Sequence, residues 1–520
     1  MLCPVAEVKK KKKITPGGDS QVKVEKAEKV ELISRSPDYR PPPAEVRRDT
    51  AITGMQWEVE ELKYIWMQTL HILKKVNTIS SPAIHAEAIL TLCETINILL
   101  HAEMSCPYDQ AIDPARPAPV NLMNVFGPWL FEACSLSDAY VQGKATAYGT
   151  LCRMVIRHHH TVLPQSLLNH FYAILHEGLT TSTNVLVTHE ILKHSSNIFN
   201  TGLEGCNVLI PAYLREIKKV LGSDSLAGGV PQEVRMRAIT ILGSLICYSS
   251  HLEGVTIPSQ GPEKEMKFSE LRGRIAAIVS DTLHNDPLPY HKTMCVWCLT
   301  VVLFEELNQP APDVPLITNV MKALLGYTVH TDRHVARASL DALSSQALVV
   351  SEITRVEPQV CKTVVMGLCA TIINQLQEQN NNKSFSLQQS VVADHYYCLM
   401  DWLSYATNLL DDTNVASKVF CAIEMGLLGL KVDQGTQLPN STPDIKDKDG
   451  KKDKEKKKRL ATTTNGSPQE KTEVLRDIME AYRLAPTHSS DAIRDAAENL
   501  LLHLLNFYHH FPCREVCRRR

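Results

Sequence analysis

The chain has 520 residues, with 55 lysines and arginines against 57 aspartates and glutamates, which gives a net charge of -2. A nearly neutral chain has no strong global field to attract nucleic acid or a membrane surface. Hydrophobic residues make up 44% and supply an extensive core, whereas aromatic residues at 6% are few for an all-β fold.

Residues 1–54 form the first segment in chain order. They are lysine-rich, with the run Lys9–Lys13, and then proline-rich, as in "RPPPAEVRR" (40–48). Such a composition holds little to bury, and we expect a disordered tail. The start "MLCPVAEVKKKKK" has no apolar stretch after its charges, so we do not expect a signal peptide.

Helical periodicity dominates residues 55–430. In the stretch that begins near Trp57, Leu62, Ile65, Leu70 and Leu73 recur at spacings of three to five residues and mark one helix face. The next pattern begins at Pro82, and proline suits a first helical turn. Further helices are predicted near 122–136, 138–158, 164–177, 184–200, 207–221, 231–250, 268–285, 290–307, 313–329, 332–350, 358–378, 387–409 and 414–430. No convincing alternating strand pattern appears.

The helix starts recur about every 20 residues, so helix pairs recur at about 40, the period of HEAT and armadillo arrays. One pair cannot bury its apolar face alone, and neighbouring pairs therefore stack. The fold class that follows is all-α: an irregular HEAT/armadillo-like α-solenoid of stacked helix pairs.

Residues 431–471 interrupt this pattern with the charged run "DIKDKDGKKDKEKKKR" (444–459). We expect a disordered insert, with a nuclear-localisation signal as the alternative. Residues 472–512 then resume the solenoid with helices near 471–483 and 489–510, and 513–520 form a basic tail. We expect the protein to be cytoplasmic, or nuclear if the lysine-rich runs act as signals.

Large apolar side chains on the predicted stripes should form the core. The predicted members are Trp66, Trp129, Phe131, Tyr148, Leu151, Phe171, Trp297 and Trp402.

The fifteen cysteines lie singly within apolar helical patterns, which indicates reduced core residues rather than a disulfide framework. The longest uncharged apolar run, "TMCVWCLTVVLF" (293–304), is shorter than the roughly 20 residues of a membrane span. We expect a soluble protein without a transmembrane segment.

Five histidines in "IRHHHTVLPQSLLNHFYAILHEGL" (156–179) raise the question of a metal site. Successive helical residues point about 100° apart, so His158, His159 and His160 cannot converge on one ion, and His170 and His176 lie on different faces. Metal ligands need a common face. A polar helix end, with groups near the last carbonyls, explains the cluster better.

Other candidate motifs also fail. In "HEILKH" (189–194) the histidines are five residues apart rather than the four that a zinc-protease helix needs. The pair in "CVWC" (295–298) sits in an apolar helix, and Glu305 and Glu306 sit at its end, where we expect them to be solvated. We find no phosphate-binding loop, no nucleophile elbow and no basic, aromatic nucleic-acid groove. The residues predict no catalytic, cofactor-binding or metal site, no cofactor and no enzyme activity, but a scaffold for protein partners.

Several collinear stretches resemble the α subunits of the Ral GTPase-activating protein complex, which are relatives of tuberin. They include "GPWLFEACSLSDAYVQGKATAYGTLCRM" (127–154), "ILKHSSNIFNTGLEG" (191–205), "RAITILGSLICY" (237–248), "LMDWLSYA" (399–406) and "AAENLLLHLLNFYHHFP" (496–512). The similarity spans roughly 55–430 and 472–512.

The resemblance implies a subunit that pairs with a β subunit and promotes GTP hydrolysis by a Ral-type small GTPase. In that family a C-terminal Rap-type GAP domain places an asparagine near the γ-phosphate, and the sequence ends at Arg520 before any such domain. We therefore expect the scaffolding and regulatory region of a GTPase activator. The alternative is a stand-alone helical-repeat adaptor unrelated to GTPases.

Overall fold

The computed structural model describes residues 59–73, 75–105, 121–159, 162–181, 184–222, 229–248, 256–258, 265–380, 389–428, 475–478 and 491–507. The chain divides into two compact units, 1–69 and 70–520. The helix α2 (Val59–Leu73) supplies the described part of the first unit and runs past its boundary. The predicted tails, at 1–54 and 513–520, and the predicted insert, 431–471, lie outside the described residues.

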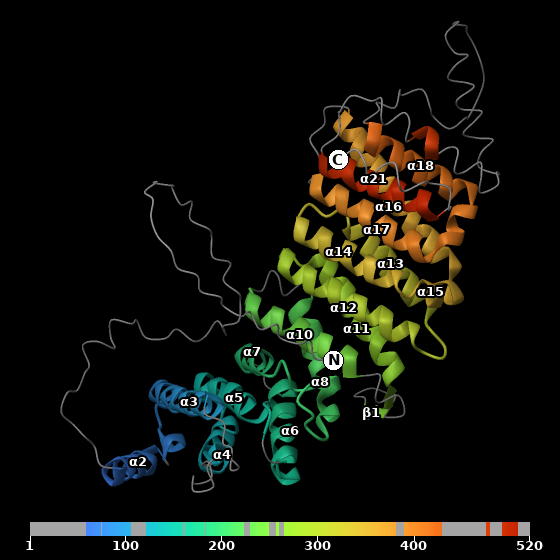
Figure 1. Ribbon diagram of the computed structural model, residues 1–520. Coiled ribbons are helices and arrows are strands. Elements are labelled where there is room, and N and C mark those ends of the chain that lie inside the picture. Colours follow the sequence, from blue (N-terminus) through green and yellow to red (C-terminus); the bar gives the residue numbers. More distant parts are fainter. Residues whose placement is uncertain are drawn as a thin grey trace, which may run out of the picture. The chain divides into compact units, whose positions relative to one another are not determined.

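The second unit is built almost entirely of α-helices (Figure 1). They are α3 (Pro82–Ser105), α4 (Leu122–Cys134), α5 (Val141–Val155), α6 (Gln165–Thr180), α7 (Val185–His194), α8 (Ile210–Leu221), α10 (Gln232–Tyr248), α11 (Phe268–Asn285), α12 (Pro289–Leu307), α13 (Val314–Tyr327), α14 (Arg333–Ala347), α15 (Val350–Val356), α16 (Pro358–Asn380), α17 (Gln389–Tyr405), α18 (Thr413–Leu428) and α21 (Asp491–Phe507). Short 3-10 turns lie at η1 (Val76–Thr78), η2 (Asp138–Tyr140), η3 (Cys206–Leu209) and η5 (Thr407–Asp411).

A small hairpin is the exception to this all-α architecture. Strands β1 (Thr256–Pro258) and β2 (Glu265–Lys267) pair antiparallel, with Ile257 opposite Met266. The sequence did not predict this hairpin, since strands of three residues are too short to show an alternating pattern. It also did not anticipate the short α15, and it placed the end of α7 too late, because residues 196–202 form turns.

Local sequence explains where many of these helices begin. The side chains of Asn121 and Asp332 each accept hydrogen bonds from two backbone N–H groups of the following first turn, and Asp313 accepts one. These side chains replace partners that a first turn lacks within the helix. The helix α3 begins at Pro82, as expected, and α12 begins at Pro289, where a missing backbone donor does no harm.

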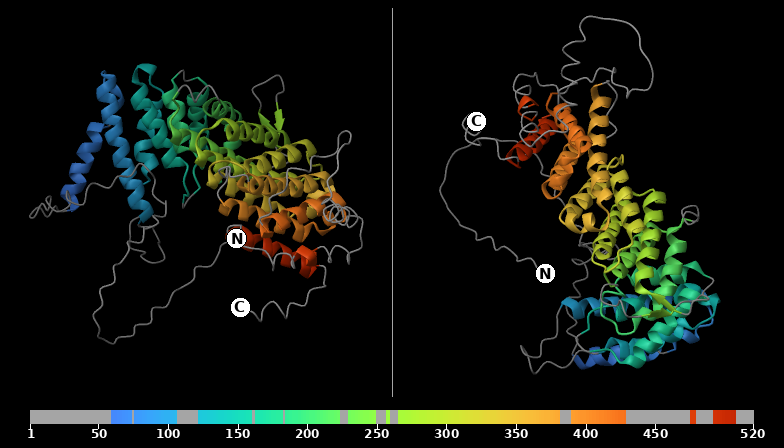
Figure 2. Two further views of the ribbon diagram at one scale, coloured as in Figure 1. Left: turned by 90° about the horizontal axis from the view of Figure 1, so that it is seen from above. Right: turned by 90° about the vertical axis from the view of Figure 1, so that its right-hand side faces the viewer.

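The helices of the second unit are arranged in two rows. In the first row, α3, α5, α7, α10, α12, α14, α17 and α21 each contact the next; in the second row, α6, α8, α11, α13, α16 and α18 do the same. The rows are joined by the pairs α6–α7, α8–α10, α11–α12, α13–α14, α16–α17 and α18–α21. Figure 2 shows these helices stacked in chain order. The all-α solenoid of stacked helix pairs is confirmed.

The core runs between the two rows along the whole second unit. Helices approach closely where side chains are small: a Cβ at Gly426 on α18 would overlap Tyr396 of α17 and Ala497 of α21. Of the predicted core residues, Tyr148, Leu151, Phe171 and Trp402 are buried, while Trp129 and Phe131 are half-buried against the core.

The predicted core position is wrong for two residues. Trp66 is 38% exposed and Trp297 is 44% exposed. The helix around Trp297 is apolar on all sides, so its periodicity does not indicate which side faces the core.

By length and composition alone, two helices are long and apolar enough to cross a membrane. The longest uncharged run, residues 293–304, had indicated that no segment is long enough. The windows are Pro82–His101 in α3 and Pro358–Glu378 in α16, and 33% and 56% of their residues, respectively, are buried inside the protein. Core helices meet the same criterion. In α16, contacts with α13, α15, α17 and α18 account for the apolar composition.

Candidate protein-interaction site

The histidine cluster lies at the end of α5, where the sequence placed it. His158 and His159 follow the helix, and His159 Nε2 lies 2.9 Å from the carbonyl oxygen of Val155 in the last turn. His170 is exposed on α6 and its ring packs 4.4 Å from that of Phe131, centroid to centroid. His160 lies outside the described residues. In the described part of the chain, no three histidine, cysteine or acidic side chains are grouped so as to hold a metal ion.

The histidines of "HEILKH" take part in structural contacts on α7. His194 Nε2 lies 2.8 Å from Arg153 Nη1 on α5 and 3.2 Å from Glu190 Oε2. Burial lowers the pKa of His194, although its hydrogen bond with Glu190 acts in the opposite direction. The contact between Arg153 and His194 joins neighbouring helices of the first row.

The cysteines of "CVWC" behave as core and near-core residues. Cys295 is buried, and burial raises the pKa of its thiol well above the ordinary value. Cys298 is half-buried beside Gly243 of α10. A thiol held in its protonated form is a poor nucleophile and a poor metal ligand.

A buried ionic network connects α8, α10 and α12. The Nη2 and Nε atoms of Arg235 donate to Asp286 Oδ2 at 2.6 and 3.0 Å, Arg235 Nη1 donates to the Val220 carbonyl, and His291 Nδ1 lies 3.0 Å from the same carboxylate oxygen. The side chains of Arg235, Asp286 and His291 are at most 4% exposed. Burial acts to raise the pKa of Asp286, but hydrogen bonds from His291, the Leu288 N–H and Arg235 lower it to about 2.

Glu306 corrects an expectation about the end of α12. It is 5% exposed rather than solvated, pairs with Arg272 of α11 at 3.0 Å, and accepts a hydrogen bond from the Asp313 N–H. Glu305 is half-buried. The local sequence could not predict this ion pair, because Arg272 lies 34 residues before Glu306.

His395 of α17 supports a prediction about pH. Its Nδ1 lies 2.7 Å from the Val391 carbonyl, its Nε2 is buried without a hydrogen-bond partner, and burial lowers its pKa to about 4. As the pH falls, the His395 imidazole binds a proton near pH 6.5 in the unfolded chain but only near pH 4 in the folded chain. Stability is therefore fully present above pH 6.5 and falls between these values, by roughly 3 kcal/mol.

We expect His395→Asn, whose amide can still donate to Val391, to flatten this part of the stability–pH curve in denaturant titrations. His284→Asn changes an exposed histidine and serves as the control. An unchanged slope in His395→Asn would show that other groups cause the pH dependence.

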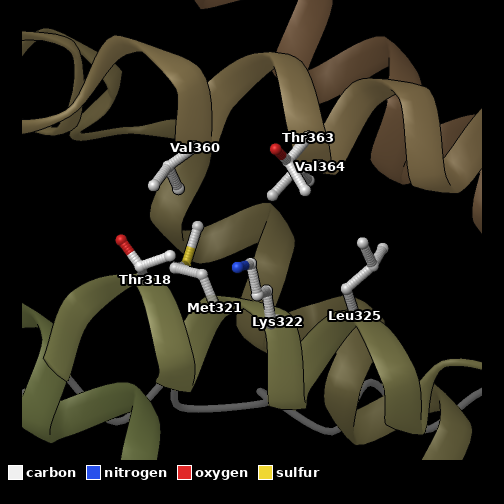
Figure 3. Close-up of a pocket in the computed structure, with 7 residues that line it drawn as sticks. All are labelled: Thr318, Met321, Lys322, Leu325, Val360, Thr363 and Val364. Carbon is white, nitrogen blue, oxygen red and sulfur yellow. The ribbon is translucent and has the colours of Figure 1, made fainter. Parts of the chain in front are cut away.

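A groove opens between α13 and α16 (Figure 3). Thr318, Met321, Lys322 and Leu325 of α13 face Val360, Thr363 and Val364 of α16 across it. Its enclosed space of about 10 Å³ has room for about one water molecule, so the groove is too small to enclose a drug-sized ligand.

The exposed side of α12 is the second candidate surface. Tyr290 is 61% exposed and Trp297 is 44% exposed, and Met294 and Val301 lie half-buried on the same helix. The spacing of these four residues, four, three and four, aligns them along one side. This apolar stripe is a candidate protein-interaction surface. The sequence did not indicate this stripe, because the apolar periodicity placed Trp297 in the core.

The described residues thus define a fold class: an all-α array of stacked helix pairs. No family model matches the chain, and no solved structure matches it. The chain is similar to the Ral GTPase-activating protein subunit alpha-1 of Rattus norvegicus, with 28% identity over 359 residues, 68% of this chain and 17% of the relative. A Rap-GAP domain-containing protein of Dictyostelium discoideum is 25% identical over 75% of this chain and 25% of the relative.

The human Ral GTPase-activating protein subunit beta is also similar, with 23% identity over 58% of this chain and 25% of the relative. The resemblance to Ral GTPase-activating protein α subunits that the sequence motifs indicated is thereby confirmed. The chain spans about a sixth of the length of the α subunits that it matches.

Proposed function

We propose that this chain is the scaffolding and regulatory region of a Ral GTPase-activating protein subunit of the α type, and that it acts in the cytoplasm. The observation that carries the proposal is the 28% identity to an α subunit over 359 residues. Similarity to the β subunit of the same complex and to a Rap-GAP domain-containing protein supports it. If the chain were a stand-alone adaptor unrelated to GTPases, its similarity to proteins named as GTPase-activating protein subunits would have no explanation.

In this proposal the helical array binds partner proteins and does not itself promote hydrolysis. Acceleration of GTP hydrolysis needs a side chain placed at the phosphates, whose removal lowers the rate by about 10³–10⁵. Polar side chains of the described helices are used in contacts between neighbouring helices, such as the hydrogen bond of Arg153 with His194 and the ion pair of Arg235 with Asp286. Stacked helix pairs instead present long surfaces that suit a β-type subunit.

The proposal predicts two results for the purified 520-residue chain. It should form a stable complex with a Ral GTPase-activating protein β subunit in size-exclusion chromatography. It should leave the single-turnover rate of GTP hydrolysis by Ral unchanged when added alone. Circular dichroism of the same sample should show the helical fold.

A separate experimental result would contradict each half of this prediction. A folded chain that does not bind the β subunit would favour the unrelated adaptor. Clear acceleration of hydrolysis by the chain alone would contradict the scaffolding role. Rap and Ras, assayed in parallel, show whether any effect is specific for Ral.

A further inference from the structure

One face of the first row combines exposed aromatic side chains with acidic ones. The helix α12 contacts α10 and α14 on its two sides and α11 at its back; α14 contacts α12, α17 and α13 in the same way, and α17 contacts α14, α21 and α16. Exposed residues in the middle turns of these three helices therefore lie on the side away from the second row, whereas Tyr290 and Tyr405 lie at helix ends. We call this side of α12, α14 and α17 the first-row face.

Large aromatic side chains are exposed on the two outer helices of the first-row face. Tyr290 and Trp297 of α12 are 61% and 44% exposed, and Tyr397 and Tyr405 of α17 are 40% and 56% exposed. Tyrosine and tryptophan offer a wide apolar surface at a small loss of side-chain entropy on binding. They are enriched among the residues that dominate binding energy at protein interfaces.

The helix between these aromatics presents one exposed acidic side chain. Asp341 of α14 is exposed, and the described part of the chain gives it no ion pair. Asp394 of α17 is neutralised by Arg337 at 2.6 Å. Partial burial and the nearby charge of Asp394 nevertheless raise the pKa of Asp341, against the effect of Arg337. The surroundings of Asp341 thus favour an added positive charge.

We propose that the first-row face binds a segment of a partner protein in which arginine stands next to apolar residues. The guanidinium pairs with the Asp341 carboxylate and lies on an aromatic ring of Trp297 or Tyr397, while the apolar neighbours cover the remaining rings. Arginine suits this arrangement better than lysine, because its planar group is weakly hydrated and stacks on aromatic faces.

The far end of the first row provides a matched control surface. The helix α3 also exposes apolar and acidic side chains, among them Ile84, Ile98 and Glu94, but its large exposed apolar residues are aliphatic. Hydrophobic attraction and negative charge alone would make the two surfaces equivalent. The proposal requires that they differ.

The test uses the full chain and a short fluorescein-labelled peptide of Leu-Arg-Ser repeats, with binding followed by fluorescence anisotropy. We expect saturable binding to the unmodified chain. Trp297→Ala should weaken it about three- to tenfold. Asp341→Lys should weaken it about tenfold or more, since like charges are then opposed. Ile98→Ala and Glu94→Lys on α3 should bind like the unmodified chain.

A charge exchange completes the experiment. A Leu-Glu-Ser peptide should fail to bind the unmodified chain but should bind the Asp341→Lys variant. All four positions are exposed, so circular dichroism should confirm intact folds. The proposal is overturned if the Leu-Arg-Ser peptide shows no saturable binding. It is equally overturned if the α3 variants weaken binding as much as the first-row variants, or if the glutamate peptide binds the unmodified chain equally well.

Discussion

Replacement of Asp286 by alanine is expected to lower the free energy of unfolding by about 3–5 kcal/mol, the cost of removing one partner from a buried ion pair. The substitution takes from Arg235 the carboxylate that both its Nε and Nη2 contact, and leaves a side chain that is only 4% exposed. His291 loses the same partner. Denaturant titration gives the total loss, and hydrogen exchange should locate it in α10, α12 and the turn between α11 and α12.

The pH dependence of the same group has a definite sign. Because the pKa of Asp286 is lowered to about 2 from an ordinary 3.8, its contribution to stability is present above pH 3.8 and is lost as pH falls toward 2. Asp286→Ala should remove this part of the acid transition. Asp341→Ala at an exposed position of α14 is the matched control and should change stability by no more than about 0.5 kcal/mol.

A double replacement separates the loss of the ion pair from the loss of packing. Arg235→Met combined with Asp286→Leu removes both charges and keeps apolar volume, so it should recover much of the stability that Asp286→Ala loses. If the double variant is as unstable as Asp286→Ala, the unpaired guanidinium of Arg235 is not the cause of the loss.

The helical fold could be predicted because its signals are local. Spacings of three and four place Tyr148 and Leu151 on one buried side of α5, and Pro82 marks the start of α3. The period of helix starts then leads to stacked pairs, since one pair cannot bury its own apolar side. Such inferences need no knowledge of which helix contacts which.

The parts that failed depend on neighbours distant in sequence. Glu306 looked like a solvated helix end, but its burial follows from Arg272 on the preceding helix. Trp297 lies in a helix that is apolar on every side, so only the positions of α10, α11 and α14 decide that it faces outward. The first-row face has the same origin, because Asp341 and Tyr397 share a surface only after their helices have stacked.

The buried counterpart of Trp297 is Trp402, and its replacement by alanine is expected to destabilise the chain by about 3–5 kcal/mol, as for other large aromatic residues in a core. Trp402 is fully buried on α17, and its Nε1 donates a hydrogen bond of 3.0 Å to the carbonyl oxygen of Leu343 on α14. Alanine would leave a cavity between two neighbouring helices of the first row and would remove that hydrogen bond.

The location of the damage tests the repeat architecture. In a stacked array each helix pair contacts only its neighbours, so a local defect loosens the nearest pairs first and unfolding need not be all-or-none. Hydrogen exchange in Trp402→Ala should therefore quicken in α14, α17 and α21 before it does so in α5 and α7. Trp402→Phe should lose less than Trp402→Ala, since it keeps one six-membered ring, but it still removes the second ring of the indole and a hydrogen bond worth about 1 kcal/mol.

Trp297→Ala provides the matched comparison, because it removes the same side chain from an exposed position. Its side chain is 44% exposed, so less apolar surface returns to water and no enclosed cavity forms. We expect its stability loss to be well below that of Trp402→Ala, within about 1 kcal/mol of the unmodified chain. Equal losses in the two variants would contradict the outward orientation of Trp297 and, with it, the aromatic character of the first-row face.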